Sequence, residues 1–246
     1  NMEIENNIKR IDISCFQECQ NLNQVTLPDT LEHVRKNAFS DCTGIKELTM
    51  PVDLDYVKTY SSDSYIDCAS FKKCENIEKI TYSKGKTGIM PDIKSGSVSY
   101  TAEYYAGKNL TTIEFEEGVK NIGARAYRLC GNSASSSYDY GMPKLKNIKL
   151  ASTVKKIGDA AFYNDKAITE FDFTNIEELG ESSFYGCSGL SDLTIPAGLK
   201  EIPAYCFYEC TGLSSLKIPE TIEKVQESAF SDCTGIKELT MPVDLD

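Results

Sequence analysis

The residues of this chain that could carry chemistry are ten cysteines, one histidine and many carboxylates. A Ser-His-Asp triad or a Cys-His nucleophile would have to use His33. That histidine lies in a slot that is filled elsewhere by Lys224 or Glu201, so we predict a solvated surface residue. A single histidine also argues against a metal site built from several histidine ligands.

The carboxylates offer two other kinds of chemistry. A glycosidase holds two carboxyl groups across a cleft. The neighbouring Glu116 and Glu117 are instead interpreted as part of a solvated acidic rim, because the sequence predicts no cleft. Asp53 and Asp55 could be weak calcium ligands. They recur as Asp244 and Asp246, but residues 38–55 and 229–246 are identical, and this duplication alone explains the recurrence. We therefore predict no enzyme, no metal site and no cofactor.

The cysteines follow a periodic pattern that is set by aromatic residues. Seven of them fall three residues after a recurring aromatic residue, and successive aromatics are 23, 32, 33, 23, 35, 22, 23 and 23 residues apart. A unit of about 23 residues, lengthened in places, is typical of a solenoid. The aromatics are Phe16, Phe39, Phe71, Tyr104, Tyr127, Phe162, Phe184, Phe207 and Phe230; the cysteines are Cys19, Cys42, Cys74, Cys130, Cys187, Cys210 and Cys233.

One cysteine per unit indicates a row of small apolar side chains inside the solenoid. Free cysteine is among the most buried residue types, so we predict buried free thiols in preference to disulfides. Asp165 and Gly107 take the cysteine slot in the two remaining units. Cys15 and Cys206 stand just before the aromatic, where other units have alanine, and are predicted to be small core residues too. Cys68 lies outside the pattern and is predicted to be the most exposed thiol.

The unit that begins at Leu190 shows which elements position these residues. Alternating apolar and polar residues at 193–195 predict a short strand, and Pro196 ends it because proline cannot donate to a strand ladder. A second inward-facing pair follows, and the corner at Cys206-Phe207 is predicted to be short helical or 3₁₀ structure. Gly212 then suits a tight turn before the next strand.

About nine such units predict one solenoid domain over residues 1–246, with short parallel strands stacked into a sheet. A polar position recurs on the solvent side of that sheet, and threonine there favours strands. Two interpretations of this position stay open. In the first, the threonines serve only sheet propensity and solubility; in the second, they form a concave binding face. The threonines in this position are Thr26, Thr49, Thr81, Thr194 and Thr240.

Three insertions, at about 52–70, 83–103 and 131–142, differ from the units in composition. They are rich in tyrosine, serine and glycine, which is the chemistry of adaptable recognition loops. Insertions in repeat proteins often map to the binding face. The alternative is that these loops have diverged in sequence without acquiring a function. The candidate binding residues are Tyr60, Tyr65, Tyr100, Tyr105, Tyr138 and Tyr140.

The repeat pattern resembles the BspA-type leucine-rich repeat family of bacterial surface proteins. It reads apolar-Pro, two inward apolar residues, then Ala-Phe-x-x-Cys and two further apolar residues, and it is almost complete in 16–50 and 190–241. The resemblance implies a leucine-rich-repeat solenoid, secretion or surface attachment, and binding of an extracellular or host matrix protein in adhesion.

Charge and chain ends bound the remaining possibilities. The net charge of −11 argues against binding to nucleic acid or to anionic membranes. No apolar run in the sequence predicts membrane insertion. The chain begins and ends in register with its repeat, so we expect a fragment of a longer array. The resulting hypothesis is a non-enzymatic protein-binding module; the alternatives are a glycan-binding module and a structural spacer.

Overall fold

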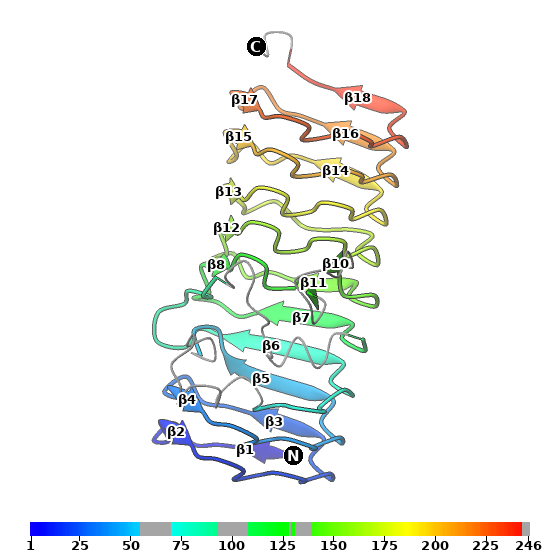
Figure 1. Cartoon of the computed structure of the whole chain (residues 1–246). Helices are drawn as coiled ribbons and strands as arrows, with labels where there is room; N and C mark the ends of the chain where they lie inside the picture. The colour runs from blue at the N-terminus through cyan, green and yellow to red at the C-terminus, as the bar shows by residue number, and fades with distance from the viewer. Residues whose placement is uncertain (55–69, 93–107, 128, 131–138, 243–246) are drawn as a thin grey trace, which may run out of the picture.

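The computed structural model describes residues 1–54, 70–92, 108–127, 129–130 and 139–242. These residues form a stack of units in which short parallel strands lie one above another (Figure 1). The described part of the chain holds strands and turns, and no helical segment in it has the length and apolar character of a membrane span. The predicted solenoid of short parallel strands is therefore confirmed.

The larger sheet contains six parallel strands. In stacking order these are β1 (Met2–Glu3), β3 (Gln24–Thr26), β5 (Glu47–Pro51), β6 (Lys79–Ser83), β7 (Thr112–Phe115) and β11 (Asn147–Lys149). Their registers align equivalent residues of successive units, so that Leu48 lies between Val25 and Ile80. These apolar residues are buried, whereas the polar residues between them reach the surface of the sheet.

A second sheet continues the stack after a gap. It contains β14 (Asp192–Thr194), β16 (Ser215–Lys217) and β18 (Glu238–Thr240). In the repeat, Asp172 takes the same position as Thr194, so the sequence predicts a strand there as well, and this prediction is wrong. Asp172 Oδ1 accepts a hydrogen bond from the backbone amide of Thr174 at 2.9 Å. Such local side-chain bonds compete with strand ladders, and the sheet is interrupted at this unit.

Two-residue strands form a further row along the stack. They are β2 (Arg10–Ile11) with β4 (His33–Val34); β8 (Asn121–Ile122), β12 (Lys156–Ile157) and β13 (Glu178–Leu179); and β15 (Glu201–Ile202) with β17 (Lys224–Val225). All of these pairs are parallel. The one antiparallel pair among the described strands joins β9 (Leu129–Cys130), just before the third insertion, to β10 (Asp139–Tyr140), within it.

The corners are chains of turns, and the predicted helical or 3₁₀ structure is wrong. The residues two before and two after the buried aromatic take positive φ, as in Tyr205 (φ 55) and Glu209 (φ 57) around Phe207. A left-handed residue at every fourth position stops a helix from propagating, because right-handed helices need negative φ throughout.

Alternate corner amides bond to different units. The amides of Cys206, Tyr208 and Cys210 bond to carbonyls three residues earlier in their own unit. Between them, the amides of Tyr205, Phe207 and Glu209 bond to carbonyls of the following unit at 3.1, 2.9 and 3.0 Å. The same alternation recurs around Phe16, Phe162 and Phe184. We call these inter-unit bonds the corner ladder.

The core between the sheets and the corners is built from stacked aromatics and thiols. Phe184 stacks between Phe162 and Phe207, with centroids 5.2 and 5.5 Å away. Cys210 Sγ donates to the Phe184 carbonyl of the preceding unit at 3.2 Å, and Cys42, Cys74, Cys187 and Cys233 bond equivalently. The buried free thiols are thus confirmed for Cys42, Cys74, Cys187, Cys206, Cys210 and Cys233.

Two described thiols differ from that prediction. Cys15 and Cys19, at the corner of the first unit, are exposed. The first corner lies at one end of the described stack, so only the following unit covers it. Cys68, and the side chain of Cys130, lie outside the described residues.

Asp165 occupies the cysteine slot and is fully buried. Its Oδ1 accepts a hydrogen bond from the backbone amide of Met142, where the third insertion rejoins the stack, and its Oδ2 has no hydrogen-bond partner. Burial raises the pKa of this carboxyl well above its usual range. The cysteines in this slot supply a hydrogen-bond donor, and a protonated carboxyl supplies one too.

Replacing Asp165 by asparagine is expected to stabilise the protein at high pH. The unfolded chain releases the Asp165 proton near its ordinary pKa while the folded chain keeps it, so the free energy of unfolding falls as pH rises above that value. Asp165→Asn removes this loss. Urea unfolding at pH 4 and pH 8 should show a gain of about 1–3 kcal/mol that is larger at pH 8. A gain or loss that is equal at both pH values would contradict the buried, protonated carboxyl.

The buried thiols are expected to resist alkylation in the folded protein. Burial raises the pKa of Cys74 and of Cys206 to about 12, and the thiolate is the reactive form. Iodoacetamide at pH 8, followed by peptide mass spectrometry, should modify Cys15 and Cys19 and spare Cys74, Cys187 and Cys206. The same treatment in guanidinium should modify all five, and equal rates without denaturant would show that the thiol row is open to solvent.

Candidate binding surface

The tyrosines of the insertions fall mostly outside the part of the chain that the structure describes. Tyr60, Tyr65, Tyr100, Tyr105 and Tyr138 lie outside the described residues. Tyr140 ends β10, where its backbone pairs with Leu129, and its side chain lies outside the described part. Their role in recognition therefore stays a prediction.

Three of the predicted threonines lie side by side on the larger sheet. Thr49 is in register with Thr26 on β3 and with Thr81 on β6. All three are partly exposed, and residues paired across neighbouring strands lie about 5 Å apart. We call them the threonine row. The strands beneath them are hydrogen-bonded on both sides, so this polar surface is held rigidly.

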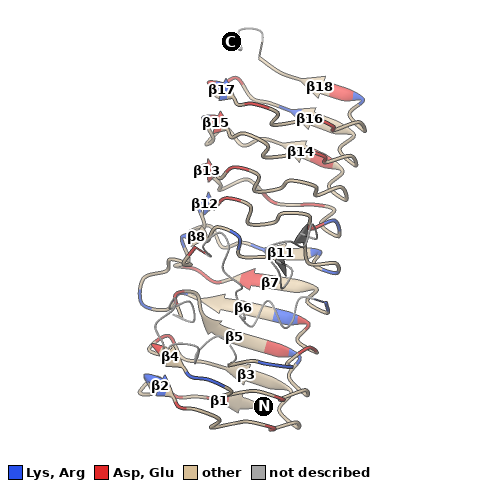
Figure 2. Ribbon diagram, in the orientation of Figure 1, with Lys and Arg blue, Asp and Glu red and all other residues tan. Residues whose placement is uncertain are grey.

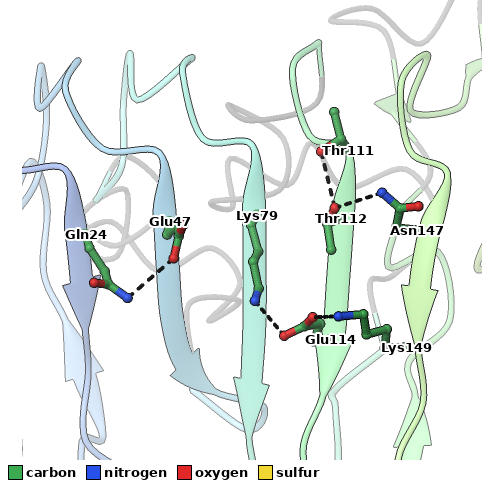
Figure 3. A network of polar contacts seen from close by, with 8 residues as sticks. All are labelled: Gln24, Glu47, Lys79, Thr111, Thr112, Glu114, Asn147 and Lys149. Atoms are coloured by element: carbon green, nitrogen blue, oxygen red, sulfur yellow. Dashed lines mark hydrogen bonds and ion pairs between the residues drawn. The ribbon is translucent and has the colours of Figure 1, made fainter.

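A network of polar side chains adjoins the threonine row (Figure 3). Gln24 Nε2 donates to Glu47 Oε2 at 3.4 Å. Lys79 Nζ lies 2.7 Å from Glu114 Oε2, and Lys149 binds the other oxygen of the same carboxylate. Glu114 on β7 is in register with Thr81, and Lys149 on β11 is in register with Glu114, so both continue the line of the threonine row. The row thus changes from neutral to charged at β7.

Glu114 is the electrostatic centre of this network. Its side chain is 20% exposed, and hydrogen bonds from Lys149 and Lys79 lower the pKa of its carboxyl. Because two lysines share one carboxylate, the three-residue group carries a net positive charge at neutral pH. Figure 2 shows the charges of β5, β6 and β7 beside one another on the sheet. The arrangement can hydrogen-bond and pair with polar groups of a partner; it holds no activated nucleophile.

The other two predicted threonines lie in the second sheet. Thr194 and Thr240 are both in register with Lys217, which stands between them. They are exposed, but they form no uninterrupted row. The predicted concave face is therefore divided into a threonine row on the larger sheet and a mixed Thr-Lys-Thr surface on the second.

Of the two carboxylates considered for calcium, Asp55 lies outside the described residues and Asp53 is engaged by the chain itself. Asp53 accepts hydrogen bonds from the backbone amides of Lys86 and Thr87 at 3.3 and 2.6 Å, and from the Thr87 hydroxyl at 2.7 Å. The two oxygens of Asp53 thus face two backbone amides and one hydroxyl of the chain. Across the described residues, no three His, Cys, Asp or Glu side chains gather as a metal site. His33 is partly exposed on β4.

Sequence reasoning missed a second group of surface residues. Tyr163, Tyr185 and Tyr208 directly follow the buried aromatic of three successive units, and their rings stack at 4.6 and 4.9 Å. The signal was present in the sequence as Phe-Tyr at 162–163, 184–185 and 207–208. We call these three residues the corner tyrosines.

Comparison with solved structures supports the fold. The chain is similar to a leucine-rich repeat protein from Bacteroides ovatus, with 22% identity and a TM-score of 0.54 over 96% of this chain and 59% of that protein. It therefore spans less than two thirds of that protein's length. It is also similar to a leucine-rich repeat protein from Eubacterium ventriosum (22% identity, TM-score 0.43, 99% of this chain and 73% of that one).

A leucine-rich cell surface protein from Faecalibacterium prausnitzii is a more distant match, with 16% identity and a TM-score of 0.29 over 94% of this chain and 82% of that one. No curated protein matches the chain. The model of the BspA-type leucine-rich repeat region, in six copies, matches residues 1–130, 99–139 and 134–246. Together with the stacked parallel strands and the aromatic and cysteine rows, this match shows that the chain belongs to the BspA-type leucine-rich repeat family.

Proposed function

We propose that this chain is a non-enzymatic protein-binding module of a bacterial surface or secreted protein, with a role in adhesion. The observation that carries the proposal is the threonine row beside the Lys79–Glu114–Lys149 group. Both are fixed on paired strands. A rigid polar surface of this kind loses little conformational entropy when a partner binds. Membership of a family of surface repeat proteins favours an extracellular or host matrix protein as the partner.

Two observations favour binding over catalysis. Buried thiols with raised pKa are inert as nucleophiles, and the one histidine of the chain is His33, on a two-residue strand. The candidate sheet face also joins residues from five neighbouring strands, which suits a broad contact. The insertion tyrosines remain candidate contacts beside this surface, and a glycan is the alternative ligand that they would suit.

The proposal predicts that a bulky side chain on the threonine row weakens binding. Thr49→Arg places a long charged side chain between Thr26 and Thr81, while Thr194→Arg makes the same change on the second sheet and serves as the matched control. Biolayer interferometry against a panel of purified matrix proteins and oligosaccharides should find a protein ligand. Thr49→Arg should weaken its binding at least about tenfold, and Thr194→Arg should weaken it less than about threefold.

A variant with Tyr100, Tyr105, Tyr138 and Tyr140 changed to serine completes the experiment. A ligand that is lost in this variant and kept by Thr49→Arg would move the contact to the insertions. Binding of an oligosaccharide that is insensitive to salt would favour the glycan-binding alternative, because charge-steered protein association weakens as salt rises. A folded wild type that binds nothing in the panel would favour a structural spacer.

A further inference from the structure

The corner tyrosines form an aromatic stack on the outside of the solenoid. Tyr185 lies between Tyr163 and Tyr208, with interplanar angles of 11° and 18°. Tyr205 packs against Tyr208 at 5.9 Å in a tilted arrangement. All four are partly exposed. Both faces of the Tyr185 ring are covered by its neighbours, so a ligand meets hydroxyl-bearing ring edges here.

Four exposed carboxylates surround this stack: Glu181, Glu209, Glu227 and Asp232. The Tyr205 hydroxyl donates to Glu227 Oε1 at 3.1 Å, and the Tyr208 hydroxyl bonds to Asp232. Burial raises the pKa of Tyr185 to about 12, and the nearby Tyr163 and Glu209 add to that shift. The negative charges thus lie close enough to act on the phenol groups.

These carboxylates differ from those of the neighbouring short strands. There, each acid has a lysine one unit away: Glu177 pairs with Lys155, Glu178 with Lys156, Glu201 with Lys224 and Glu223 with Lys200. No ion pair joins any of the four carboxylates around the corner tyrosines to a lysine or arginine of the described residues. In the solenoid, the acids near the short strands are therefore paired with lysines, whereas the four acids around the corner tyrosines are not.

We propose that the corner tyrosines, with Glu181, Glu209, Glu227 and Asp232, form a second binding surface that takes an extended peptide segment rich in arginine or lysine. Guanidinium and ammonium groups donate charge-assisted hydrogen bonds to carboxylates. The stacked tyrosines supply rigid contact area beside them. This surface goes beyond the proposed function, because it uses none of the residues of the threonine row.

The dimensions suit a short segment. Stacked strands lie about 4.8 Å apart, so the four units from Tyr163 to Asp232 extend over about 14 Å. An extended chain advances about 3.4 Å per residue, so six residues span the surface with a margin at each end. A neutral glycan suits it less well, because sugar rings pack on aromatic faces and most of these faces are occupied.

The test uses fluorescein-labelled hexaarginine as the probe and the full chain as the receptor. Fluorescence anisotropy at low salt gives the dissociation constant for the wild type and for two variants of equal net charge. The corner variant carries Glu181→Gln, Glu209→Gln, Glu227→Gln and Asp232→Asn. The control variant carries Glu170→Gln, Asp192→Asn, Glu220→Gln and Glu238→Gln, which are exposed acids elsewhere on the stack.

The corner variant should bind hexaarginine at least about tenfold more weakly, since it loses all four carboxylates that would pair with the probe. The control variant should stay within about threefold of the wild type. A Tyr185→Phe, Tyr208→Phe variant keeps ring stacking and net charge and should lose about threefold or more. Thr49→Arg should leave this binding unchanged, which separates the surface from the one proposed above.

Three results would overturn the proposal. Equal losses in the corner and control variants would show that the probe follows net charge alone. A folded wild type that does not bind hexaarginine at low salt would show that the surface is no cation site. Binding of a neutral oligosaccharide that is lost in the Phe variant, without binding of hexaarginine, would make the surface a glycan site. Circular dichroism melts of all variants confirm that each is folded.

Discussion

The corner ladder is the constraint on which the rest of the structure depends. Every second amide around a buried aromatic bonds to the following unit, as Phe207 does to the Ala229 carbonyl at 2.9 Å. These bonds fix the register between units on the side of the solenoid that has no sheet. Once the register is fixed, the aromatics must stack and each thiol must meet the carbonyl of the preceding aromatic. The left-handed residues that break a helix are what make the alternation possible.

The fixed register also aligns equivalent residues of successive units in rows on the surface. A residue type that recurs in one slot of successive units reappears at the spacing of the strands, whether the slot lies on a sheet or at a corner. The threonine row arises in this way on the larger sheet, and the corner tyrosines arise on the turns. Because both rows are held by inter-unit hydrogen bonds, their geometry is set before any partner arrives. Recognition by rigid rows is the functional consequence of the repeat.

Much of this could be predicted from the sequence, because spacing alone reports which residues share a slot. The intervals between aromatics predicted the solenoid, and the cysteine three residues on predicted the buried thiols. Backbone dihedrals leave no such trace: Ser, Asn, Ala and Tyr all occupy left-handed positions at the corners, as Tyr205 shows. The sequence predicted a tight turn at Gly212. Glycine is needed there for another reason, because a Cβ would lie 2.3 Å from the Ser188 carbonyl oxygen of the preceding unit. The interruption of the sheet at Asp172 also leaves no trace in the spacing; it accompanies a local hydrogen bond of the Asp172 side chain. The corner tyrosines were not predicted, because their stacking depends on the register of the corners, which residue spacing alone does not give.

The most direct test of this account is amide hydrogen exchange, read residue by residue by nuclear magnetic resonance. The account predicts that the amides of Tyr205, Phe207 and Glu209 exchange as slowly as the amide of Leu216, in the centre of β16, because all of them hold neighbouring units together. The amides of exposed turn residues without an inter-unit bond should exchange faster. If the corner amides exchanged orders of magnitude faster than those of the strands, the sheets alone would hold the stack and the corner ladder would not be its organising constraint.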